Sequence, residues 1–140
     1  MKNRALSILA VLAVAALLAT PMAFAQSEYL KANIPFDFVV ADRDLPAGTY
    51  RVRCRAESNS VILRGVDVKV ALIATTNSTS AAKLPREGKL IFTRYGNSYF
   101  LAEIWTPWNR TGNALIKSKA EREVAAQAAQ GGRTEVAMSR

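Results

Sequence analysis

The sequence predicts a single antiparallel β-sandwich or small barrel of six to seven strands, followed by one short C-terminal helix. Short segments alternate apolar and polar residues with a period of two, and clusters of turn residues separate these segments at even spacing. A helical pattern occurs only after residue 117. Short, regularly spaced strands without intervening helices are typical of antiparallel sandwiches and barrels.

The first 25 residues have the pattern of an export signal. Lys2 and Arg4 precede an apolar run over 5–19, Pro21 ends the run, and Ala-Phe-Ala at 23–25 supplies the small residues that flank a cleavage point. The run is short for a membrane span, and no second apolar stretch follows it. We therefore predict an exported protein, periplasmic or extracellular, that has no transmembrane segment once residues 1–25 are removed.

The remaining chain divides into a β domain over 26–117, a helix within 118–131 and a flexible tail over 132–140. The strands are expected at 33–40, 49–57, 61–64, 66–72, 89–95 and 99–105. The last two face each other across Gly-Asn-Ser at 96–98 and form a hairpin. The Thr/Ser-rich segment 75–82 is predicted to be a loop, and 106–113 a connector.

The alternation within the strands assigns their two faces. In 33–40, the residues expected to point inward are Ile34, Phe36, Phe38 and Val40. The segment 49–57 has the strictest period. It places Tyr50, Val52, Cys54 and Ala56 on one face and Arg51, Arg53 and Arg55 on the other.

Ser118 and Glu121 have the spacing of a capping box, which starts a helix over 119–130 that ends at Gly131-Gly132. Val124 is the only large apolar residue of this helix, so we expect weak docking and a loose tail behind it.

Composition restricts the chemistry. The chain has no histidine, which excludes imidazole-dependent catalytic triads and histidine-bearing zinc sites. We predict no cofactor and no metal. Without the signal, seventeen basic and eleven acidic residues leave a net charge of +6. This excess favours an anionic polysaccharide or envelope component as partner, and it also promotes solubility. The sequence has no glycine-rich phosphate loop or helix-turn-helix pattern, and export also argues against nucleic acid.

The single cysteine has no intramolecular partner. The strand pattern predicts that Cys54 is a small buried apolar residue, and an intermolecular bridge or a reactive thiol is the alternative.

Three groups of residues are candidate sites. Arg51, Arg53 and Arg55 form a charged row at about 6.6 Å spacing that could bind phosphates or carboxylates, or remain a solvated face. The alternative is a carbohydrate-binding module in which Trp105 and Trp108 stack on sugars. A carboxylate-based hydrolase is a distant alternative, whose candidate carboxylates are Asp37, Asp67 and Glu103.

An outer-membrane barrel would also contain alternating strands. It requires strands of about 9–11 residues with an outward apolar band. The strands predicted here are shorter, and their polar faces carry charged residues such as Arg51 and Lys69.

Several segments together resemble a family of small, uncharacterised exported bacterial proteins. They are Ile-Pro-Phe-Asp-Phe at 34–38, Leu-Pro-Ala-Gly-Thr-Tyr at 45–50, the run from Arg94 through Trp105, and 117–123. The family has no established activity, so the resemblance implies bacterial origin and an envelope or extracellular address but no site residues. We therefore expect a non-catalytic envelope or extracellular protein with a binding or structural role.

Overall fold

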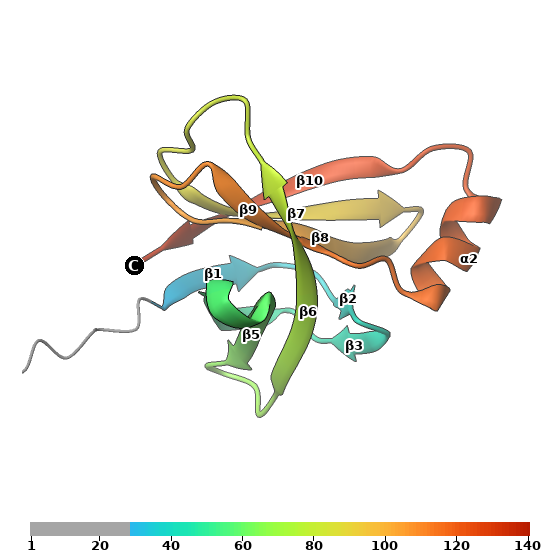
Figure 1. The fold of residues 1–140 in the computed structure, drawn as a ribbon. Coiled ribbons are helices and arrows are strands. Elements are labelled where there is room, and N and C mark those ends of the chain that lie inside the picture. Colours follow the sequence, from blue (N-terminus) through green and yellow to red (C-terminus); the bar gives the residue numbers. More distant parts are fainter. Residues whose placement is uncertain (1–28) are drawn as a thin grey trace, which may run out of the picture.

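The computed structural model describes residues 29–140, and the predicted signal over 1–25 lies outside this range. Ten strands and one α-helix make up most of the described chain (Figure 1). The strands are β1 Leu30–Ile34, β2 Phe38–Val40, β3 Arg43–Leu45, β4 Gly48–Arg55, β5 Ser60–Gly65, β6 Ala71–Ser80, β7 Gly88–Tyr95, β8 Ser98–Trp105, β9 Thr111–Leu115 and β10 Gly132–Ser139. The helix α2 spans Lys119–Gln127, and a 3₁₀ turn, η1, spans Ala56–Ser58.

Eight of the strands close into an antiparallel barrel, which decides between the two predicted architectures. The order around the barrel is β8-β7-β10-β1-β4-β5-β6-β9, and β9 pairs back with β8 through Glu103↔Ala114 and Ile104↔Asn113. The first half of β8 instead pairs in parallel with β2, and β3 pairs with β2. The structure therefore has more strands than the six or seven predicted.

The barrel interior is filled with apolar side chains. The largest fully buried side chains of this core are Tyr50, Phe38, Phe92, Ile34, Leu45, Leu63, Leu90, Ile104, Val40, Val52 and Val61. The hydroxyl of Tyr50 donates a hydrogen bond to the Pro46 carbonyl at 2.6 Å, which satisfies its polar atom within the core. The charged side chains of the strands lie on the outer surface, so the predicted alternation between an apolar and a polar face holds for most strands.

The predicted strand 33–40 is two strands. Ile34, Phe38 and Val40 are buried as expected, and Phe36 stacks on Tyr99 with ring centroids 3.9 Å apart. The ladder is interrupted at Pro35, which lacks an amide donor, so β1 ends at Ile34 and β2 begins at Phe38.

The strand predicted at 66–72 and the loop predicted at 75–82 are both wrong. Residues 66–70 form a compact bend in which the Gly65 amide donates to the Val70 carbonyl at 2.8 Å. A Cβ on Gly65 would lie 2.2 Å from the carbonyl oxygen of Val68, so this bend requires glycine. Strand β6 follows and runs through the Thr/Ser segment, because its inward positions Leu72, Ala74 and Thr76 continue the alternation.

Predictions at the ends of the strands also need correction. The strand predicted to reach Glu57 ends at Arg55, and Ala56 is an exposed residue of η1. The predicted connector 106–113 already contains the start of β9, which pairs with β6 through Ser78↔Asn113 and neighbouring pairs.

The tail predicted to be flexible is the strand β10. It lies between β7 and β1, and its alternate residues Thr134, Val136 and Met138 face the core side. The helix before it is confirmed but ends at Gln127, three residues early. The Ser118 hydroxyl accepts a hydrogen bond from the Glu121 amide at 3.1 Å, as the capping box predicts. Burial raises the pKa of the Glu121 carboxyl, and the charge of Lys117 partly opposes this shift.

Candidate functional site

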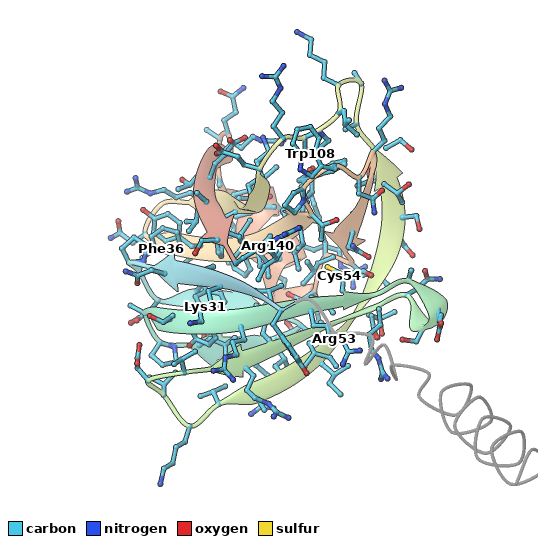
Figure 2. All side chains as sticks on the ribbon, turned by 90° about the vertical axis from the view of Figure 1, so that its left-hand side faces the viewer. Lys31, Phe36, Arg53, Cys54, Trp108 and Arg140 are labelled. Carbon is cyan, nitrogen blue, oxygen red and sulfur yellow. The ribbon has the colours of Figure 1, made fainter. Side chains whose placement is uncertain are left out.

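The predicted arginine row lies on the outside of β4 and belongs to a larger cationic surface. Strand register places Lys31 of β1 opposite Arg51, and Arg51 opposite Arg64 of β5. Since neighbouring strands are about 4.8 Å apart, these three side chains form a second row perpendicular to the first. We call Lys31, Arg51, Arg53, Arg55 and Arg64 together the basic face. Figure 2 labels Lys31 and Arg53, which come from these neighbouring strands.

The basic face forms no ion pair within the described part of the chain. None of the ion pairs formed within residues 29–140 involves any of its five members. Arg53 instead lies over the Tyr29 ring, with its guanidinium carbon 5.4 Å from the ring centroid, and donates to the Tyr29 hydroxyl at 3.5 Å. This cation–π contact does not neutralise the charge of the guanidinium group. On the β6 side, Ile73 projects into solvent with 67% of its surface exposed.

The opposite side of the barrel carries both cations and carboxylates. On β7, β8 and β10, the Lys89 ammonium lies 3.1 Å from the Glu135 carboxylate. The Arg133 guanidinium lies 3.7 Å from both Glu103 and Glu135. Cations and carboxylates are therefore paired there, in contrast to the basic face.

The two tryptophans do not form one stacking surface. Trp105 is only 6% exposed, and its indole N–H donates to the Glu103 carboxylate at 2.8 Å. Its ring lies against Gly112 of β9, where a Cβ would lie 2.6 Å from the ring. The prediction that Trp105 is exposed for stacking on sugars is therefore wrong, because the side chain is buried.

Trp108 is 65% exposed and lies in the β8–β9 loop with a φ of +58°. Large aromatic residues rarely adopt this left-handed backbone conformation. The Trp108 amide donates to the Pro85 carbonyl at 2.8 Å, which fixes this loop against the β6–β7 loop.

The three candidate carboxylates have separate roles. Asp37 accepts the Ala47 amide at 2.8 Å and so closes the turn around β2 and β3. Asp67 is exposed in the bend between β5 and β6, and Glu103 is occupied by Trp105 and Arg133. These contacts give no support to the distant alternative, a carboxylate-based hydrolase.

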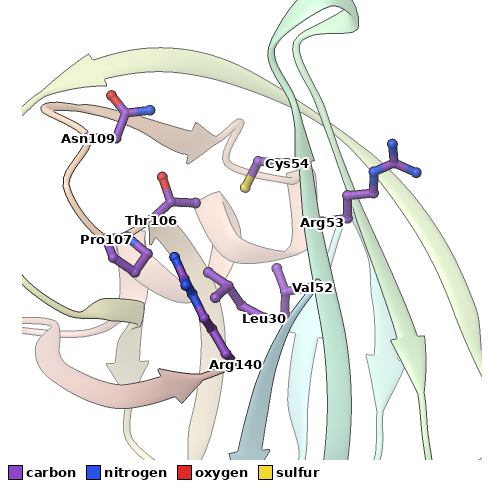
Figure 3. A pocket seen from close by; sticks show the side chains of 8 residues that line it. All are labelled: Leu30, Val52, Arg53, Cys54, Thr106, Pro107, Asn109 and Arg140. Carbon is purple, nitrogen blue, oxygen red and sulfur yellow. The ribbon is translucent and has the colours of Figure 1, made fainter. Parts of the chain in front are cut away.

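Cys54 is partly buried at the end of β4. It lines a pocket of about 430 Å³ with Leu30, Pro107, Asn109 and other residues (Figure 3). Figure 3 shows the sulfur inside the pocket and the Arg53 guanidinium directed away from it. Burial raises the pKa of the Cys54 thiol to about 11, so the thiol is protonated at neutral pH.

Within residues 29–140, no group of three or more Cys, Asp or Glu side chains is placed to hold a metal ion. No helix in this range is both long and apolar enough to cross a membrane. Comparison of the chain with protein-family models, curated proteins and solved structures found no match.

Sequence reasoning missed Lys31 and Arg64. Each occupies an outward position of its own alternating segment, but their adjacency to Arg51 depends on strand order. That order joins β1, β4 and β5, and it is a property of the folded barrel.

Proposed function

We propose that this protein is a non-catalytic exported protein that binds anionic polymers through the basic face. The observation that carries the proposal is the register Lys31–Arg51–Arg64, which crosses the arginine row of β4, and none of these cations forms an ion pair within residues 29–140. Five cations on a stiff sheet present a two-dimensional grid, with spacings of about 4.8 and 6.6 Å.

Acidic polysaccharides are the partner class that fits this grid best. Their carboxylates or sulfates recur along the chain, and guanidinium groups bind such oxyanions with two parallel hydrogen bonds. Four of the five cations are arginines. Because the face is convex and solvated, binding gains most from the release of counterions and depends strongly on salt.

The test compares binding to dextran sulfate and to neutral dextran, which share one backbone, at low and fourfold higher salt. We expect binding to dextran sulfate only, weakened at least about tenfold by the higher salt. The triple variant R51Q/R53Q/R55Q should lose this binding.

A matched variant controls for net charge. K117Q/K119Q/R122Q removes the same three charges from around helix α2, where all three positions are exposed, and should keep most of the affinity. Equal losses in the two variants would mean that net charge, and not the basic face, is responsible. Salt-insensitive binding to neutral dextran that is lost in Trp108→Asn would instead favour the carbohydrate-binding alternative.

A further inference from the structure

Two loops at one end of the barrel form a second cationic surface with a different composition. The β6–β7 loop spans residues 81–87 and the β8–β9 loop spans 106–110. We call Lys83, Leu84, Arg86, Trp108 and Arg110 on these loops the loop tip. Figure 2 shows Trp108 at the end of the molecule next to the β6–β7 loop.

Hydrogen bonds hold the two loops together. The Trp108 amide donates to Pro85 at 2.8 Å, and the Ala81 amide donates to the Arg110 carbonyl at 2.9 Å. Within the second loop, the Asn109 side chain accepts the Thr111 amide at 2.9 Å. These hydrogen bonds hold the backbones of the two loops in one arrangement before any partner binds.

The apolar members of the loop tip project outward. Trp108 is 65% exposed and Leu84 is 43% exposed, although both are large enough to fill a core position. The positive φ of Trp108 is a conformation that glycine or asparagine adopts more easily, so the fold holds an indole in solvent at a backbone position unsuited to it.

The loop tip also carries three cations, which lie on the same two loops as these apolar side chains. Lys83, Arg86 and Arg110 are all exposed, and none of them takes part in the ion pairs formed within residues 29–140. Glu87 is the one carboxylate in these loops, which leaves a local charge of +2.

We infer that the loop tip docks this protein on an anionic lipid surface. The exposed indole and leucine can enter the headgroup region, and the three cations can contact lipid phosphates. A dissolved polyanion would use the cations but would leave Leu84 without a role. The combination of exposed apolar and cationic side chains on one pair of loops therefore favours a bilayer. This inference rests on different residues from the basic face and does not depend on the function proposed above.

The experiment uses vesicles of phosphatidylcholine alone and vesicles with 30% phosphatidylglycerol, some carrying brominated acyl chains. We expect binding only to the anionic vesicles, with tryptophan fluorescence shifted to the blue and quenched by the bromine. Trp105 is only 6% exposed, and the comparison with a variant that lacks Trp108 assigns the quenched emission to one of the two tryptophans.

Two variants distinguish the contribution of Trp108 insertion from the contribution of the three cations. Trp108→Asn suits the left-handed backbone and so preserves the fold; we expect it to abolish quenching and to weaken binding about tenfold. K83Q/R86Q/R110Q should weaken binding about 100-fold, at roughly fivefold for each cation. The variant R51Q/R53Q/R55Q should keep the quenching.

Three results would overturn the inference. One is the absence of binding to anionic vesicles. Another is binding without quenching, which would assign the contact to surface charge alone. The third is loss of quenching in R51Q/R53Q/R55Q but not in K83Q/R86Q/R110Q, which would assign docking to the basic face. Dextran sulfate binding is measured on the same samples, so either proposal can fail without the other.

Discussion

Cys54 shows how a residue's position within one strand determines its chemistry. It continues the inward phase of Tyr50 and Val52, but it lies at the end of β4 where the barrel opens into a pocket. The thiol is therefore partly rather than fully buried, in contrast to the sequence-based prediction. Removal of water from the thiolate raises the pKa of Cys54 to about 11, so its reactivity at neutral pH is low.

We predict that alkylation of Cys54 by iodoacetamide is slow at pH 7.5 and that its rate rises with an inflection near pH 11. The same shift affects stability. The unfolded thiol ionises near pH 9 and the folded thiol near 11, so the free energy of unfolding falls across this window, by at most about 3 kcal/mol. Cys54→Ser should lack this part of the decrease when urea unfolding is measured at pH 8 and 11. An inflection of the alkylation rate near pH 8.5 would contradict the burial of the thiol.

Individual elements differ in how well local sequence predicts them. Helix α2 is encoded by residues three positions apart, and the β7–β8 hairpin by a turn of two residues, Gly96 and Asn97, with φ of +60° at Gly96. These signals are local, so sequence reasoning found both elements. Strand β6 was missed because its second half contains hydroxyl side chains, and only pairing with β9 shows that Thr76 points inward.

The residues of the candidate sites also differ in whether local sequence predicts their positions. The outward direction of Arg51, Arg53 and Arg55 follows from alternation within one strand, and the structure confirms that these residues share the outer side of β4. The contribution of Lys31 and Arg64 to the basic face depends on pairing between strands. The burial of Trp105 depends on β9, whose Gly112 admits the ring. Neither contact has a local sequence signal.

The cap of helix α2 can be tested on its own. Ser118→Ala removes the oxygen that accepts the Glu121 amide, and we expect a loss of about 1 kcal/mol in the free energy of unfolding. Ser118→Asp keeps an acceptor at this position and should retain most of the stability. Both values come from urea denaturation followed by circular dichroism. Equal losses in the two variants would mean that the hydroxyl contributes through another contact.

At the scale of the whole molecule, the barrel joins the two ends of the described chain. Strand β10 pairs with β7 along seven residues, from Gly132↔Arg94 to Met138↔Gly88, and with β1 through Lys31↔Ser139 and Ala32↔Met138. Closure therefore depends on contacts between residues about 100 positions apart, and such contacts form slowly during folding. The rigid surface of β1, β4 and β5 that carries the basic face exists only after this closure.

We therefore predict that a chain ending at Gly131 does not fold cooperatively. Loss of strand β10 would leave β1 and β7 with open edges and would remove Met138 from the core. Unpaired strand edges promote aggregation. A milder variant, Met138→Ala, should fold but lose about 2–4 kcal/mol in urea denaturation. Ala137→Ser, at an exposed position of the same strand, should change stability by less than about 0.5 kcal/mol. A shortened chain that melts cooperatively at the temperature of the full protein would contradict closure through β10, because the remaining strands would then be stable as an open sheet.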